Sequence, residues 1–296
     1  MKQVIINKIF AVVLVLFSIK ATSQSMTVTL SANYSHEVKI YHDEPLLLIV
    51  SVTNQEAQEN SRWNKAADRR LNELEELLKA GKIKREDYDR EKTKLMAGKR
   101  QLSSVTIGAA GRPWSSLIKW SMVNINSGVE IPLAVKTMMH PSAEEVAVLN
   151  EKGYYTAYFG MDADKVKSKP AGLYEITASI ENESSLPVRI EIKNETTPVA
   201  IAGSEEMLLR HGQYYWHAGD AAAGMKYAEK ILQKNPASLD GLSLKGDLLL
   251  LNNSYAPALE SYRKALKEYY KQNGVAAEPP EYLLNMIEFV KKELGQ

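Results

Sequence analysis

Cysteine is absent from all 296 residues of this chain. A chain without cysteine forms no disulfide bonds and binds no metal ion through thiolates. It also lacks the cysteine to which a bacterial lipoprotein anchor is attached. The absence therefore removes three ways in which an exported protein is commonly stabilised or tethered.

An excess of charge of either sign is also missing. The chain has 37 Lys and Arg residues against 36 Asp and Glu residues, a formal net charge of +1. Proteins that bind nucleic acid or anionic membranes through electrostatics generally have a clear basic excess. We therefore expect neither partner.

Long apolar runs are confined to the N-terminus. Lys2 and Lys8 precede an apolar run over residues 9–19, and small residues follow at 21–23. This order is typical of a secretory signal peptide. A membrane anchor is the alternative, but the run is well short of the roughly twenty residues that a membrane-spanning helix needs.

We predict a signal peptide over residues 1–23, with cleavage after Ser23. Loss of Lys2, Lys8 and Lys20 with this peptide would change the formal charge from +1 to −2. The mature protein is then expected to be exported and soluble, either in the periplasm or outside the cell, including at its surface.

Catalytic and metal-binding motifs are also lacking. The chain shows no paired nucleophile and base, no phosphate-binding loop and no metal-ligand spacing. Its histidines form no ligand motif; they are His36, His42, His140, His211 and His217. We expect no cofactor, no metal and no enzymatic activity. An enzyme built from dispersed carboxylates is a separate hypothesis, which requires a cleft with two converging acids of different pKa.

Residues 24–202 show mostly alternating hydrophobicity. Short β-rich runs separated by turn residues predict an antiparallel β-sandwich. The runs lie at residues 26–30, 38–40, 46–52, 116–123, 154–159, 174–180 and 188–192. Within them, the phrases at 42–54 and 170–182 resemble the strand and turn phrases of bacterial immunoglobulin-like and macroglobulin-type domains. The resemblance implies a fold and no chemistry.

A charged helical hairpin is predicted to interrupt the sandwich at about residues 55–100. Leucines recur at helical spacing up to Leu78, Gly81 ends the first helix, and a second helix follows. Residues 74–95 resemble a short helical motif that is common at the C-termini of bacterial proteins, although here it lies in mid-chain. Either the hairpin is a solvated insertion or it is a docking arm for another protein. Trp63 could serve in either the core or a contact.

An internal repeat dominates residues 203–296. Segments 205–238 and 239–272 align at an offset of about 34 residues, the length of a tetratricopeptide unit. Small residues recur where two helices of a hairpin must approach closely, at Gly212, Gly224, Gly246 and Ala258. The segment resembles a pair of tetratricopeptide repeats followed by a capping helix after Pro280. Two hairpins are fewer than the three usually needed for stability, so we expect the array to pack against the sandwich or another chain.

The tetratricopeptide resemblance implies a concave groove that holds an extended peptide or a helix. By register, its candidate partner-binding residues are Leu209, Gln213, Trp216, His217, Ser243, Asp247, Leu250 and Leu251. Trp216 is the favoured contact residue, although Trp216 and Leu250 could instead pack inside the protein. No basic residue at these positions could hold a terminal carboxylate.

The sequence therefore predicts a multidomain β plus α protein that is a non-enzymatic exported scaffold. Its expected partner is another protein or peptide of the cell envelope. The alternative function is glycan binding by the sandwich, with the helices as support. Tyr154, Tyr155 and Tyr158 would stack against the sugar if they shared an exposed sheet face.

Overall fold

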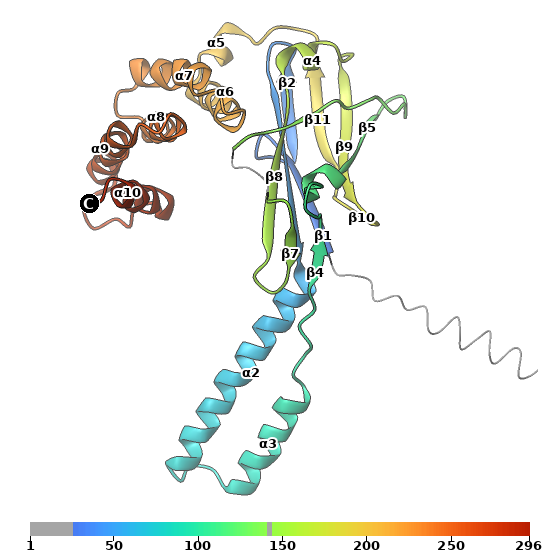
Figure 1. Cartoon of the computed structure of the whole chain (residues 1–296), viewed down its shortest axis with the longest axis vertical. Helices are drawn as coiled ribbons and strands as arrows, with labels where there is room; N and C mark the ends of the chain where they lie inside the picture. The colour runs from blue at the N-terminus through green and yellow to red at the C-terminus, as the bar shows by residue number, and fades with distance from the viewer. Residues whose placement is uncertain (1–25, 141–143) are drawn as a thin grey trace, which may run out of the picture. The chain divides into compact units, whose positions relative to one another are not determined.

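The computed structural model describes residues 26–140 and 144–296. The predicted signal peptide lies outside the described residues. Strands dominate the first part of the described chain and a helical array follows, as Figure 1 shows, so the predicted β plus α class is confirmed. The chain divides into two compact units. One comprises residues 26–27, Thr53–Ile107 and Val148–Tyr154, and the other comprises Val28–Val52, Gly108–Ala147 and Tyr155–Gln296.

The strands form two larger sheets and one small one. The first sheet has the order β1-β3-β8-β6, the second has the order β10-β9-β11-β2 with β5 also paired to β9, and β4 pairs with β7. The strands are β1 (Met26–Ala32), β2 (Glu37–Tyr41), β3 (Leu46–Asn54), β4 (Val105–Ile107), β5 (Lys119–Asn124), β6 (Lys136–Thr137), β7 (Ala147–Leu149), β8 (Tyr154–Met161), β9 (Gly172–Ile180), β10 (Glu183–Ser184) and β11 (Val188–Lys193). A short 3-10 helix, η1 (Trp114–Leu117), and helix α4 (Ala163–Lys167) complete this part.

Alternation along the strands produces the sandwich core. Every second residue of β9 is buried, from Tyr174 to Ile180, and β11 buries Val188, Ile190 and Ile192 in the same way. Period-two burial of this kind places one face of each strand inward. The rings of Trp120 on β5 and Phe159 on β8 meet edge to face at 5.1 Å. Side chains of the two larger sheets therefore meet in one core.

The second sheet is mixed, whereas the sequence predicted antiparallel pairing. Strands β9 and β11 pair antiparallel, but β2 lies parallel to β11, with Ile40 opposite Ile192. The chain crosses from β1 in the first sheet to β2 in the second and returns to β3 in the first. A parallel pair between segments so far apart in sequence has no local turn signal, so strand patterns alone do not reveal it.

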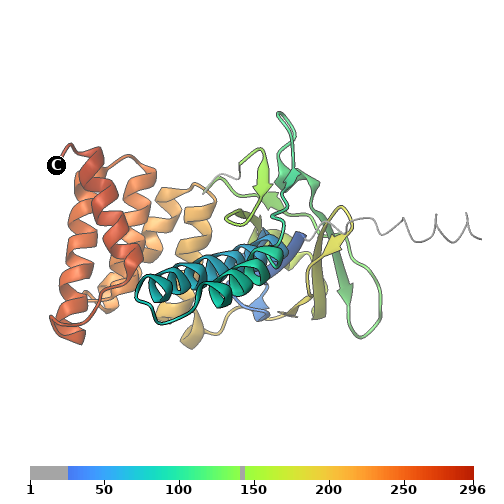
Figure 2. The ribbon, with the colours of Figure 1, turned by 90° about the horizontal axis from the view of Figure 1, so that it is seen from below.

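The predicted insertion forms a hairpin of two helices, α2 (Gln55–Lys79) and α3 (Arg85–Ala97), which lie side by side in Figures 1 and 2. Asn54 caps the first helix by accepting a hydrogen bond from the backbone N–H of Ala57 at 2.9 Å. Buried Tyr88 of α3 donates its hydroxyl to Glu75 of α2 at 3.0 Å. Trp63 packs against Gly98, where an added Cβ would lie 2.6 Å from its ring. Trp63 thus contributes to contacts inside the hairpin.

The second unit ends in an array of helices, seen in Figure 2 as neighbouring rods. Its helices are α5 (Val199–Ala202), α6 (Glu205–His217), α7 (Ala221–Lys234), α8 (Leu239–Leu251), α9 (Tyr255–Asn273) and α10 (Glu281–Glu293). Helices α6 and α7 form one hairpin, α8 and α9 form another, and α10 packs on α9. Leu283, Ile287 and Val290 of α10 join the buried cluster of the second hairpin.

Glycines allow the close helix contacts that the sequence predicted. A Cβ at Gly212 would lie 2.4 Å from Leu244, one at Gly224 would lie 2.5 Å from Leu248, and one at Gly246 would lie 2.6 Å from Tyr262. Such distances are far below van der Waals contact, so a larger residue at these positions would push the helices apart. Close helix contact at these glycines is confirmed, but the large side chain opposite lies in the same hairpin only for Gly246 and in the next hairpin for Gly212 and Gly224.

The array also packs against the sandwich, as expected for so short a repeat. Tyr214 of α6 joins Leu47, Ile49 and Met138 in a buried cluster. Both the sandwich core residues and the array fall within the second compact unit, so the division into separate domains at residue 202 stays a prediction. Among residues 26–140 and 144–296, no helix combines the length and apolar character needed to cross a membrane.

Candidate functional site

A cavity of about 390 Å³ lies along α6, α8 and α10. Five of the eight predicted groove residues line it: Leu209, Gln213, Trp216, Ser243 and Asp247. Three of them lie on α6 and two on α8. Within each helix they are three or four residues apart, so they share one face of that helix. The register of the repeat thus locates a real hollow in the protein, and its size is within the range of ligand sites, roughly 300–1,000 Å³.

The other three predicted residues lie outside this lining. His217 is only 1% exposed, Leu250 packs against the cluster that includes α10, and Leu251 packs against the cluster of the first hairpin. The packing alternative therefore describes Leu250 better than the contact alternative does. Trp216 serves both roles, since it lines the cavity and also packs against the first hairpin.

Further lining residues are ones that the repeat register did not assign to the groove. Tyr34 belongs to the turn between β1 and β2, while Tyr269 and Tyr282 belong to α9 and α10. The remaining lining residues are Leu239, Asp240, Leu244, Pro280 and Leu283. Asn33 signals a turn in the sequence, but no sequence pattern indicates that this turn reaches α6.

The Tyr34 turn has an unusual backbone. Asn33 and Tyr34 adopt φ angles of 45° and 65°, in the left-handed region that residues other than glycine seldom occupy. Asn33 is held there by Leu47, whose carbonyl accepts its N–H at 2.8 Å and whose N–H donates to its side chain at 3.0 Å. Strained backbone persists where surrounding contacts fix it and is frequent at functional sites. Here it directs a tyrosine into the cavity lining.

His217 connects this turn to the array. Its Nδ1 lies 2.7 Å from the carbonyl oxygen of His140, and its Nε2 lies 2.7 Å from the hydroxyl of Tyr34. Burial lowers the pKa of His217 to about 4, so the ring is neutral at physiological pH. Because a carbonyl accepts but never donates, Nδ1 carries the hydrogen and Nε2 accepts from Tyr34. The ring of Tyr158 stacks on His217 with centroids 4.1 Å apart.

Asp247 is the main ionisable group of the cavity. Its Oδ1 accepts the hydroxyl of Tyr262 at 2.6 Å and also the hydroxyl of Tyr282. Burial raises the pKa of Asp247 to about 6, and the two hydroxyl donors oppose that rise. Within the described chain its second oxygen, Oδ2, accepts no hydrogen bond from a protein group. The side chain thus combines one fixed oxygen with one unused acceptor.

Asp240 is the second acid of the cavity. Burial and then the nearby charge of Glu205 raise its pKa. Asp240 and Asp247 lie seven residues apart on α8, which separates their backbones by about 10 Å at 1.5 Å per residue. Because both side chains are carboxyl groups, the lining carries negative charge when they are ionised.

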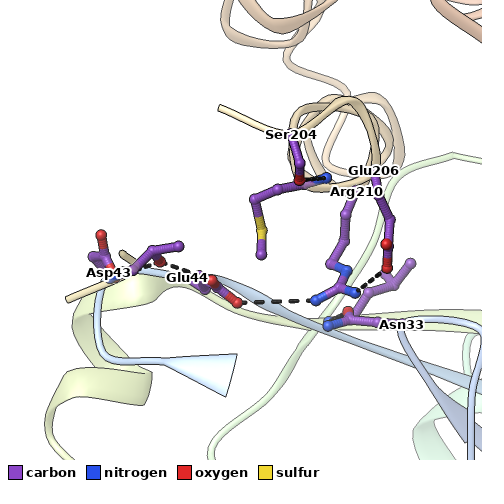
Figure 3. Close-up of polar contacts among 9 residues, drawn as sticks. Asn33, Asp43, Glu44, Ser204, Glu206 and Arg210 are labelled. Atoms are coloured by element: carbon purple, nitrogen blue, oxygen red, sulfur yellow. Dashed lines mark hydrogen bonds and ion pairs between the residues drawn. The ribbon is translucent and has the colours of Figure 1, made fainter. Parts of the chain in front are cut away.

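A separate polar contact joins α6 to the sandwich. Arg210 of α6 points toward buried Glu44, with Nη1 4.0 Å from Oε2, and it also pairs with Glu206 at 3.0 Å, as Figure 3 shows. Thr197 has one hydroxyl hydrogen and lies within hydrogen-bond distance of two carboxylates, 2.7 Å from Glu44 and 2.8 Å from Asp43. Burial raises the pKa of Glu44. These contacts hold the array on the sandwich rather than form an open site.

Asp43 accepts the backbone N–H of Thr197 at 2.7 Å, so the stretch from His42 to Glu44 contributes to the contact just described. The described part of the chain has no group of three or more His, Asp or Glu side chains placed to hold a metal ion. Of the three tyrosines proposed to stack on sugar, Tyr154 is exposed and Tyr158 packs on His217. Alternation along β8 places Tyr155 on the face opposite to that of Tyr154 and Tyr158, so the three rings do not share one sheet face.

Comparison of the chain with protein-family models and with curated proteins finds no match in either set.

Proposed function

We propose that this is an exported, non-enzymatic scaffold that binds a segment of another envelope protein in the groove formed by α6, α8 and α10. One observation carries the proposal most directly. Five of the eight positions that line a tetratricopeptide groove by register also line one hollow on the protein, with Trp216 among them. The basic and apolar pattern before residue 23 supports the exported location.

The composition of the lining also favours binding of a peptide. Apolar and aromatic surfaces alternate with a few polar groups, Gln213, Ser243 and Asp247, which can fix the orientation of a bound chain. Trp and Tyr residues are frequent at the energetic centres of protein interfaces. The contacts of Tyr34 and Arg210 with neighbouring elements would keep the groove in one shape before a partner binds, which lowers the entropic penalty of association.

The test is a crosslinking pull-down from the envelope fraction of the source cells with a groove-filling variant. Ser243→Trp places a bulky ring in the cavity, whereas Glu260→Trp places the same ring on the exposed surface of α9. We expect Ser243→Trp to lose a specific protein partner that wild type and Glu260→Trp both retain, with unchanged circular dichroism. Retention of every partner by Ser243→Trp would move the function away from the groove.

Two further measurements separate the alternatives. Retention of the purified protein on polysaccharide, unaffected by Ser243→Trp, would favour the glycan-binding alternative. Cell fractionation with a tagged chain should recover the protein outside the cytoplasm, lacking residues 1–23 by mass spectrometry. Recovery of the full-length chain in the cytoplasm would contradict the exported location.

A further inference from the structure

The cavity beside α8 has a charge of one sign. Its two ionised lining groups are Asp240 and Asp247, and no Lys, Arg or His occurs among the described residues that line it. Glu205, whose charge contributes to the raised pKa of Asp240, adds a third negative group close by. A ligand with a terminal carboxylate or a phosphate would therefore meet repulsion and would find no basic group to pair with.

Asp247 lines this cavity, and its two oxygens differ in their contacts with the described residues. Tyr262 and Tyr282 both donate to Oδ1, which fixes the carboxylate group, while Oδ2 accepts nothing from the described chain. Ionised carboxylates provide about four acceptor sites, so this one retains capacity for a strong donor. Hydrogen bonds from ammonium or guanidinium groups to carboxylates are roughly twice as strong as bonds between neutral groups.

Aromatic rings surround the same hollow. Trp216, Tyr34, Tyr269 and Tyr282 all line it, and they come from four different elements. The faces of such rings attract cations, by about 0.5–1 kcal/mol at exposed sites and by more when water is excluded. A cation bound by an acid and flanked by aromatic rings gains from both effects, and an anion or a neutral polar group gains from neither.

We infer that the cavity binds the basic side chain, lysine or arginine, of an extended peptide held in the groove, with Asp247 as its counter-ion. This inference rests on the proposed function and specifies the partner: a protein segment with a basic residue between apolar or small polar neighbours. The apolar residues Leu209, Leu239 and Leu283 would contact the aliphatic stem of that side chain.

The experiment measures binding of nonapeptide pools to the purified full chain by biolayer interferometry. Each pool has one fixed central residue, Lys, Arg, Gln or Glu, between positions randomised among Ala, Ser, Leu and Thr. The proteins compared are wild type, Asp247→Asn, which keeps an acceptor for both tyrosines, and Ser243→Trp. At pH 7.5 we expect wild type to bind the Lys and Arg pools about tenfold more tightly than the Gln pool, with the Glu pool weakest.

Asp247→Asn should reduce that preference to less than about twofold, because the charge that pairs with the basic residue has been removed. Ser243→Trp should weaken all four pools. Equal binding of the Lys and Gln pools by wild type, or a preference that persists in Asp247→Asn, would overturn the inference and leave the groove function intact. Failure of wild type to bind any pool would count against both the inference and the groove function.

Discussion

The hydroxyl of Tyr34 donates to Nε2 of His217 at 2.7 Å, across 183 positions of sequence. The contact joins a strained turn of the sandwich to the last turn of α6. It also positions a tyrosine that lines the cavity, because Tyr34 belongs to both the contact and the lining. The shape of the groove therefore depends on the sandwich as well as on the repeat.

Removal of this hydroxyl tests the contact. We expect Tyr34→Phe to lower the free energy of unfolding by about 1–2 kcal/mol, because Nε2 of a buried histidine loses its donor. Urea denaturation measures the change. Tyr270→Phe removes a hydroxyl on α9 that makes no hydrogen bond to the described residues, and it should change stability by less than about 0.5 kcal/mol. Equal effects of the two substitutions would contradict the role of the Tyr34 hydroxyl.

Acid should destabilise the protein through His217. Burial lowers its pKa from 6.5 to about 4 in the folded state, so folding favours the neutral ring. The corresponding stability is fully present above pH 6.5 and is lost as the pH falls toward 4. At about 1.4 kcal/mol per pKa unit, the loss amounts to roughly 3 kcal/mol.

The variant His217→Gln isolates this contribution. Glutamine can still donate and accept hydrogen bonds, but it does not titrate. We expect the difference in unfolding free energy between wild type and His217→Gln to favour wild type at pH 7.5 and to shrink or reverse at pH 4.5. Parallel stability curves across this range would show that His217 does not titrate as described.

Asp247 should reduce stability at neutral pH. Its pKa rises from 3.8 to about 6 on folding, so the folded state disfavours the charged form. The native state is therefore penalised above pH 6 and relieved as the pH falls below 4. We expect Asp247→Asn to raise the free energy of unfolding by about 3 kcal/mol at pH 7.5 and to have little effect at pH 3.5.

Thermal or urea unfolding at these two pH values measures that gain. A stabilising substitution that abolishes lysine preference would mark Asp247 as a residue whose charge serves binding at the expense of stability. A loss of stability at pH 7.5 would instead show that the hydrogen bonds from Tyr262 and Tyr282 outweigh the burial of its charge.

The stability that Arg210 contributes should depend on the charge of Glu44. Arg210→Met keeps the aliphatic stem but leaves the fully buried Glu44 without its cation, so we expect destabilisation by about 2 kcal/mol. The same substitution should cost less than about 0.5 kcal/mol when Glu44 is already glutamine. A double-mutant cycle by urea denaturation measures the coupling, and additive effects would show that the pair contributes no coupling.

Local patterns in the sequence predicted several elements correctly. The charged helical stretch after Asn54 became α2 and α3, because helical spacing of leucines and the stop at Gly81 are local properties of the chain. The repeat register predicted small residues at Gly212 and Gly246, which lie opposite Leu244 of the next hairpin and Tyr262 of the same hairpin, since tight helix packing limits residue size. The tetratricopeptide resemblance implied that Trp216 and Asp247 face a groove, and both residues line the cavity.

Tertiary structure decided the features that join distant segments. The parallel pairing of β2 with β11 and the contact between Tyr34 and His217 involve residues separated by about half the chain or more. Local hydrophobic patterns cannot predict such contacts, because they depend on neighbouring residues and not on which distant segments come together. The sequence by itself determined where most helices and strands form and which helix faces carry small residues that allow close packing. Packing of the array on the sandwich determined that Tyr34 completes the cavity and that His217 is buried. Packing of α8 with α9 and α10 determined that one oxygen of Asp247 accepts two tyrosine hydroxyls.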